Sequence, residues 1–219
     1  TLSAFSAVET VCVVVNAAIG VEYGTRRMME MAKSRGLCRV LVVNRIDAEP
    51  ARLAALIAQL REEFGPECLP INLPAKAGSA VVDCFFTPTG ESDVEEVGAA
   101  HQRIIDQVVE INETVMGRYL EEGEAGLSGQ DLHDAFEQCL REGHLVPICF
   151  TSARTGAGVK ELLDLAEKLF PSPLEGNPPQ FVRGSGAEPI ALKMEDAKAH
   201  VVADVFKIVN DPFVGKLSV

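Results

Sequence analysis

The segment Val40-Leu41-Val42-Val43-Asn44-Arg45-Ile46-Asp47 joins a short apolar run to a polar turn. Such a run is typical of a strand that is buried on both faces of a parallel sheet. Residues 11–15 form a similar run, and the spacing of apolar residues predicts helices over residues 25–34 and 53–64. Strands that alternate with helices through short turns predict an α/β fold with right-handed crossovers.

The middle of the chain interrupts this alternation. Residues 68–73 and 80–86 are predicted to pair as antiparallel strands. One long amphipathic helix is expected to include residues 104–119, and a further helix is expected to begin at Ser128, which can cap it, and to end at Gly143. The sequence therefore predicts a subdomain of mixed α+β type inserted into the parallel-sheet domain.

The first architecture returns after this insertion, because another apolar strand turns into an amphipathic helix. The predicted segments are a parallel-sheet domain in residues 1–66 and 145–172, the inserted subdomain in residues 67–144, a proline-rich linker in residues 173–199, and the opening of an all-β domain in residues 200–219. The chain begins at Thr1 and not at a methionine, and its first strand follows almost at once. We therefore expect it to be a fragment of a longer protein.

Composition and charge limit the classes of function. The 219 residues are 47% hydrophobic and 24% charged, which is the balance of a folded protein and excludes a disordered tail or a basic nucleic-acid arm. The net charge is -12, and acidic residues crowd between Glu91 and Glu124, where only Arg103 and Arg118 are basic. This stretch would repel phosphate backbones and attract a basic partner, so no direct nucleic-acid contact is expected here. A solvated helix face is the alternative interpretation of such a charge run.

The six cysteines predict neither a disulfide framework nor a metal centre. Cys12, Cys84 and Cys149 lie inside apolar runs, where a reduced thiol packs as a small hydrophobe, and no C-x-x-C or Cys/His pair has metal-ligand spacing. The sequence contains no signal peptide and no apolar stretch long enough to span a membrane. It therefore predicts a cytoplasmic protein that does not contact membranes.

Polar residues follow the second predicted strand at the edge where open α/β sheets bind ligands. Asp47 can accept two parallel hydrogen bonds from a purine that presents a ring N–H beside an exocyclic amine, which guanine has and adenine lacks. Asn44 can hold the loop and meet the far edge of the base, while Arg45 can lay its stem on the ring. An ordinary turn followed by a helix cap is the alternative interpretation of these residues.

A second signal follows the predicted strand 145–151. GTPases bind guanine with an N-K-x-D motif and with a later Ser-Ala, whose backbone amide donates to the guanine oxygen. The residues Asn44 to Asp47 resemble the first motif, with Arg45 in place of lysine, and Ser152-Ala153 resembles the second. Although Ser-Ala alone is an ordinary strand-to-helix turn, the two motifs occur in the correct order and flank an insertion. Together they predict a guanine site formed by Asn44, Arg45, Asp47, Ser152 and Ala153.

Further motifs make the chain resemble a translational GTPase, and specifically elongation factor G, over nearly all its length. Residues 18–22 resemble the family's A-x-x-G-V turn, and residues 170–173 resemble the L-P-S-P that ends its GTPase domain. Residues 69–71 and 118–121 resemble landmarks of its inserted subdomain. Residues 206–217 resemble the F-K-x-x-x-D-P-x-x-G-x-L that opens its second, β-barrel domain. The arginine in the guanine motif also fits an elongation-factor-G-like paralogue.

The resemblance implies the C-terminal part of a P-loop-GTPase-type parallel sheet with an inserted α+β subdomain, followed by the start of a β barrel. It implies GTP or GDP as the cofactor, and Mg²⁺ whose ligands lie outside this chain. The sequence has no G-x-x-x-x-G-K-[ST] and no D-x-x-G, so the N-terminal P-loop and switch regions are expected to be missing. We therefore expect this chain to contain no catalytic residue, to bind guanine weakly and not to hydrolyse GTP.

The resemblance also implies partners. The full-length factor would be a monomer that couples GTP hydrolysis to ribosomal translocation or a related ribosome step. Its acidic insert, including Glu110 and Glu113, would dock on the ribosomal stalk protein. The alternative is a non-catalytic ribosome- or protein-binding module that keeps the fold without using a nucleotide, an idea that Arg45 slightly supports.

Overall fold

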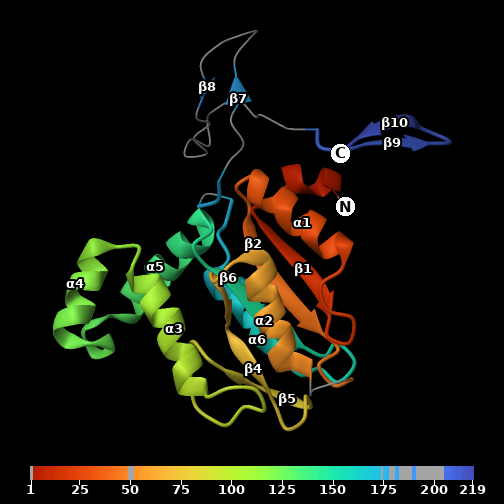
Figure 1. Cartoon of the computed structure of the whole chain (residues 1–219). Coiled ribbons are helices and arrows are strands. Elements are labelled where there is room, and N and C mark those ends of the chain that lie inside the picture. The colour runs from red at the N-terminus through yellow and green to blue at the C-terminus, as the bar shows by residue number, and fades with distance from the viewer. Residues whose placement is uncertain (1, 49–51, 174, 178–180, 183–188, 191–204) are drawn as a thin grey trace. The chain divides into compact units, whose positions relative to one another are not determined.

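The computed structural model describes residues 2–48, 52–173, 175–177, 181–182, 189–190 and 205–219 (Figure 1). The chain divides into two compact units. Thr10–Phe170 form the larger unit, and Thr1–Glu9 with Pro171–Val219 form the smaller one. Each unit is described by itself below.

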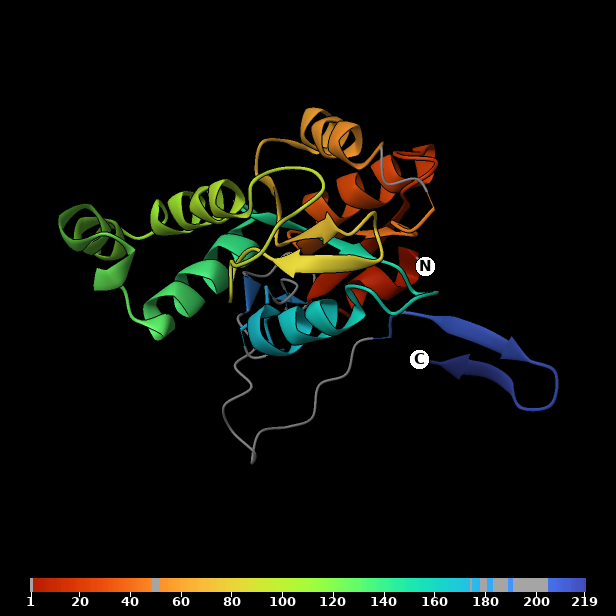
Figure 2. The ribbon, with the colours of Figure 1, turned by 90° about the horizontal axis from the view of Figure 1, so that it is seen from below.

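A parallel sheet forms the centre of the larger unit. Its strands are β1 (Thr10–Asn16), β2 (Cys38–Asn44), β6 (Val146–Thr151) and β3 (Cys68–Pro70), in the spatial order β1-β2-β6-β3. Helices α1 (Tyr23–Ser34) and α2 (Leu53–Phe64) cover one face of this sheet, and α6 (Val159–Leu169) covers the other (Figure 2). The register pairs Asn16 with Asn44 and Asn44 with Thr151, so that three strands end at the same level. The loops that follow these strands therefore emerge side by side.

The first strand differs from the prediction. We expected residues 11–15 to be buried on both faces, but only Val11, Val13 and Val15 are buried, while Cys12 and Val14 are exposed. The reason is position, because β1 lies at the edge of the described sheet and α1 packs against it from one side. In β2, which has a strand on each side, every residue before Asn44 is buried, as predicted.

The predicted strand 68–73 divides into two. Residues Cys68–Pro70 join the main sheet as β3, parallel to β6, while β4 (Asn72–Ala75) pairs antiparallel with β5 (Ala80–Asp83). Our prediction of a single strand within an antiparallel pair was therefore wrong for its first half. The chain changes partner at Ile71, whose backbone N–H still donates to the Ile148 carbonyl at 2.9 Å.

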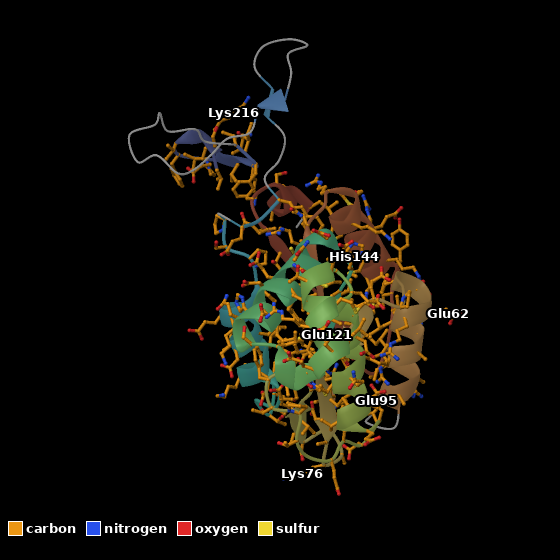
Figure 3. All side chains as sticks on the ribbon, turned by 90° about the vertical axis from the view of Figure 1, so that its left-hand side faces the viewer. Glu62, Lys76, Glu95, Glu121, His144 and Lys216 are labelled. Carbon is orange, nitrogen blue, oxygen red and sulfur yellow. The ribbon has the colours of Figure 1, made fainter. Side chains whose placement is uncertain are left out.

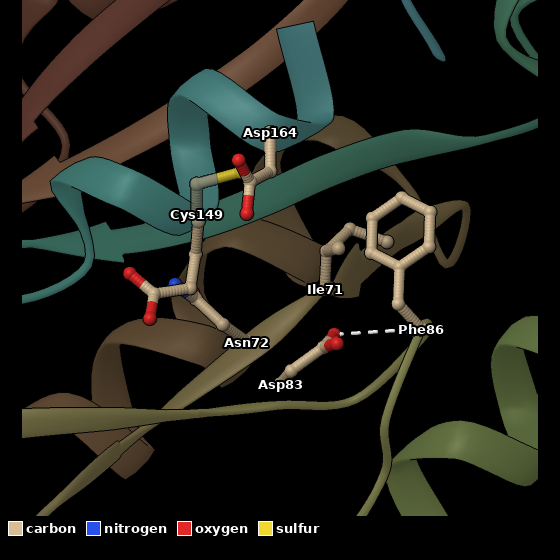
Figure 4. A pocket seen from close by; sticks show the side chains of 7 residues that line it. Ile71, Asn72, Asp83, Phe86, Cys149 and Asp164 are labelled. Atoms are coloured by element: carbon tan, nitrogen blue, oxygen red, sulfur yellow. Dashed lines mark hydrogen bonds between the residues drawn. The ribbon is translucent and has the colours of Figure 1, made fainter. Parts of the chain in front are cut away.

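Just after the chain leaves β6 at Ile71, the side chain of Asn72 forms the hydrogen bonds to β6 that a strand backbone would otherwise form. It is 2% exposed, its Nδ2 donates to the Phe150 carbonyl oxygen at 3.1 Å, and its Oδ1 accepts from the Phe150 backbone N–H at 2.6 Å. The amide thus replaces the backbone of a missing strand residue beside β6. It lies in the wall of a cavity of about 30 Å³ that Cys149 and Asp83 also line (Figure 4). The last residues of β6, which lead into the site, are fixed by this pair of bonds.

The acidic part of the chain is helical, but it is not one long helix. It forms α3 (Val97–Val109) and α4 (Glu113–Glu122), which are separated at Asn112. The Asn112 side chain accepts hydrogen bonds from the backbone N–H groups of Thr114 and Val115 at 3.0 and 3.2 Å, so it caps α4 and starts a new helix. The next helix, α5 (Gly129–Glu142), begins after Ser128 and ends at Gly143 as predicted.

In its described residues, the smaller unit contains a 3₁₀ helix and two antiparallel strand pairs. The elements are η1 (Leu2–Ser6), β7 (Phe181–Val182) with β8 (Pro189–Ile190), and β9 (Ile208–Asp211) with β10 (Gly215–Ser218). The segment predicted as a linker therefore contains β7 and β8. Most of that segment, and the predicted strand residues 200–204, lie outside the described residues. The start of a β barrel stays a prediction.

Candidate functional site

The candidate site is built by the loops that leave β2 and β6. Ile46, which is completely buried, anchors the first loop, and its backbone N–H donates to the Thr151 carbonyl at 3.3 Å. This bond ties the first loop to the end of the neighbouring strand. The two sequence motifs, which are more than a hundred residues apart, therefore lie next to each other.

Asp47 and Ser152 are in direct contact. The Ser152 hydroxyl donates to Asp47 Oδ1 at 2.6 Å, and Ser152 itself is completely buried. The Asp47 side chain is 12% exposed, so its carboxylate lies at the surface with its position fixed from below. The loops after β2 and β6 therefore meet at Asp47 and Ser152, and the role of these residues in binding guanine stays a prediction.

Asn44 ties the two loops together. Its Oδ1 accepts a hydrogen bond from the backbone N–H of Arg45 at 2.8 Å and another from the backbone N–H of Ala153 at 3.0 Å. Asn44 therefore holds the loop, as predicted from its type and position. In this state the Ala153 amide that was assigned to the guanine oxygen is engaged with Asn44.

Arg45 has an unusual backbone conformation. Its φ is 69°, in the left-handed region that residues with a side chain rarely adopt, and the bond from its N–H to Asn44 Oδ1 fixes this conformation. The residue is exposed. Its stacking on a base stays a prediction.

Arg154 is the contact that sequence reasoning missed. Its Nε donates to Asp47 Oδ2 at 3.0 Å, and its Nη2 donates to the same oxygen. The Arg154 side chain is 79% exposed. The sequence did contain a signal for this contact. A cation lies two residues after Ser152, at the edge of the sheet where Asp47 was expected without an assigned protein partner.

These contacts set the charge of Asp47. The hydrogen bond from Ser152, followed by that from Arg154, holds the pKa of the Asp47 carboxyl below its ordinary value. Asp47 is therefore a carboxylate at neutral pH, with acceptor oxygens only. That is the state in which it can accept hydrogen bonds from two N–H groups of a ligand.

The β4–β5 turn supports the Asp47 loop from the side. Lys76, Ala77 and Gly78 have consecutive positive φ angles of 52°, 53° and 75°. A Cβ atom on Gly78 would lie 2.2 Å from the Ile46 carbonyl oxygen, so the turn approaches the loop as closely as only glycine permits. Lys76 projects from this turn (Figure 3). Sequence reasoning missed the contact, because it depends on how the hairpin is placed.

Within the described residues, no three or more His, Cys, Asp or Glu side chains are grouped so that they could hold a metal ion. None of the helices in the described parts of the chain has the length and hydrophobicity needed to cross a membrane.

The comparisons with known proteins identify the family and the fold of the chain. The family described as elongation factor Tu GTP binding domain matches residues 1–172. The fold is similar to the crystal structure of ttk003000868 from Thermus thermophilus, with a TM-score of 0.74 and 28% sequence identity. That match covers 99% of this chain and 32% of the other, so this chain spans about a third of the length of the solved relative. The chain belongs to the elongation factor Tu GTP binding domain family, and its parallel sheet with helices on both faces is the α/β fold of a P-loop GTPase.

Proposed function

We propose that this chain supplies the guanine-binding half of the nucleotide site of an elongation-factor-G-like protein. The observation that carries the proposal is the Asp47 carboxylate, ionised and held at the surface by the buried Ser152 hydroxyl. A carboxylate fixed in this way suits the guanine edge, where a ring N–H and an exocyclic amine point in the same direction. Adenine presents an acceptor at the ring position and would be repelled there.

The neighbouring groups complete the proposed reading of the base. Asn44 accepts a hydrogen bond from the Ala153 backbone N–H, and this N–H would donate to the guanine oxygen once that bond is released. Arg45, exposed on the same loop, can cover one face of the ring with its stem. The groups that bind the phosphates and Mg²⁺ are those of the P-loop and switches, whose motifs do not occur in this sequence. In the longer factor, GTP hydrolysis would drive ribosomal translocation or a related ribosome step.

A titration of the 219-residue chain followed by ¹H–¹⁵N NMR tests base recognition. GDP is expected to shift the amide signals of Asp47 and Ala153, while ADP at equal concentration leaves them in place. Binding will be weak, because phosphate contacts are missing, and a phosphate-release assay should show no GTP turnover above a heat-killed control. Equal shifts with GDP and ADP would contradict the proposal. Absence of any shift would favour the non-catalytic binding module.

We further propose that the acidic surface of α3 and α4 docks on the ribosomal stalk protein. The surface consists of exposed glutamates at the C-terminal cap of α3 and on α4, and Figure 3 shows one of them, Glu121, on α4. Both basic residues of this stretch are already paired, Arg103 with Glu95 and Arg118 with Asp131. The exposed members of the surface are Glu110, Glu113, Glu121 and Glu122.

A double charge reversal tests the docking surface. Glu110→Lys with Glu113→Lys is expected to weaken binding of the chain to isolated stalk protein roughly fivefold at low salt, with a smaller difference at high salt. Binding can be measured by calorimetry. The matched control is Glu30→Lys with Glu62→Lys, which makes the same charge change at exposed positions of α1 and α2. If both double variants lose affinity equally, net charge and not this surface is responsible.

A further inference from the structure

The hydrogen-bonding capacity of Asp47 is largely used within the protein itself. A carboxylate offers about four lone-pair positions, two on each oxygen. Ser152 occupies one on Oδ1, while Nε and Nη2 of Arg154 both donate to Oδ2. One position on Oδ1 is left. A base that needs both oxygens of Asp47 finds no acceptor for its second N–H.

We propose that Arg154 is a built-in competitor of the nucleotide, which covers the base-reading edge of Asp47 and has to leave before guanine can bind. This inference rests on the proposed guanine-binding function and adds a residue that regulates it. The competition is chemical mimicry. A guanidinium presents two N–H groups on one carbon, and the ring N–H and exocyclic amine of guanine are arranged in the same way.

The two partners of Asp47 differ in their freedom to move. Ser152 is completely buried and stays in place, since its hydroxyl also accepts the Thr155 backbone N–H at 3.3 Å. Arg154 is 79% exposed and can turn into solvent at little cost. Ser152 is thus the fixed support of the carboxylate and Arg154 its exchangeable partner. Displacement of an exposed ion pair of this kind lowers the apparent affinity for a ligand roughly two- to fivefold.

The first experiment compares Arg154→Ala with the unaltered chain by NMR titration with GDP. The variant is expected to bind GDP roughly two- to fivefold more tightly, because the carboxylate no longer has an internal partner. Arg154→Lys, which keeps the charge but has no paired N–H groups, should lie between the two. Arg27→Ala removes the same charge from an exposed position on α1 and should leave the affinity unchanged. Unchanged or weaker GDP binding by Arg154→Ala would overturn the proposal.

A double-mutant cycle locates the competition at Asp47. In an Asp47→Asn background, titrated with xanthosine diphosphate, adding Arg154→Ala should change affinity less than twofold, because the charged partner of Arg154 is gone. The same gain in both backgrounds would show that Arg154 acts elsewhere, and would overturn the inference.

The guanine site and the competitor role of Arg154 can be disproved separately. If the unaltered chain binds GDP and Asp47→Asn prefers xanthosine diphosphate, while Arg154→Ala has no effect, only the competitor role is wrong. If the chain distinguishes GDP from ADP in no variant, both the guanine site and the competitor role are wrong.

Discussion

Asp47→Asn is expected to reverse the base preference of the chain from guanine to xanthine. The Asp47 carboxylate can only accept hydrogen bonds from the base, whereas an asparagine amide would accept one hydrogen bond from the base and donate one to it. Xanthine has a carbonyl where guanine has its exocyclic amine, so it matches the amide. Loss of a hydrogen bond to a charged group costs about 1.5–3 kcal/mol, which corresponds to roughly a ten- to hundredfold loss of GDP affinity. Parallel NMR titrations with GDP and xanthosine diphosphate measure the reversal.

A control and a pH series make this result specific. Asp134→Asn removes the same charge from an exposed position on α5 and should leave the base preference unchanged. Since Ser152 and Arg154 lower the pKa of Asp47, GDP binding should stay constant as the pH falls from about 8 to about 5. Binding is lost only at lower pH, where the carboxyl takes up a proton. A variant that loses GDP without gaining xanthosine diphosphate would show that Asp47 supports the loop and does not read the base.

The candidate site could be predicted from the sequence because its residues follow buried strands. The apolar run before Asn44 shows where its strand ends. Parallel strands bring their carboxyl ends to one edge of a sheet. The convergence of Asp47 and Ser152 depends on these two facts and on the sheet order, which places β2 beside β6. Arg154 was missed although it lies two residues after Ser152, because no pattern of buried residues identifies the partner of so exposed a side chain.

The errors in the predicted fold arise where local sequence patterns do not specify a break or a strand's neighbours. Helical or strand periodicity extends across a break when the interrupting residues do not change the pattern of apolar side chains. Residues 104–119 kept helical spacing through Asn112, although this residue caps a new helix. β3 is only three residues long, too short for its partner to be recognised from alternation. The exposure of Val14, at 61%, depends on sheet order, which no local pattern specifies.

Asn72→Ala is expected to lower the free energy of unfolding of the larger unit by about 3 kcal/mol. The substitution leaves the buried backbone N–H and carbonyl of Phe150 without the partners that Asn72 provides, and each unsatisfied buried group costs about 1–3 kcal/mol. For a unit of this size the melting temperature should fall by roughly 6–12 °C. Thermal unfolding followed by circular dichroism measures the shift.

Two further substitutions separate hydrogen bonding from packing at this position. Asn72→Leu fills a similar volume but forms neither bond, so it should destabilise the unit nearly as much as Asn72→Ala. Asn112→Ala, which removes a partly exposed helix cap, should cost only about 1 kcal/mol. If Asn72→Leu were as stable as the unaltered chain, packing and not the bonds to Phe150 would explain the burial of this amide. The bonds between Asn72 and Phe150 also predict an effect on nucleotide binding. Because Phe150 lies two residues before Ser152, Asn72→Ala should weaken GDP binding even at temperatures where the chain is folded. Asn112→Ala should not weaken it.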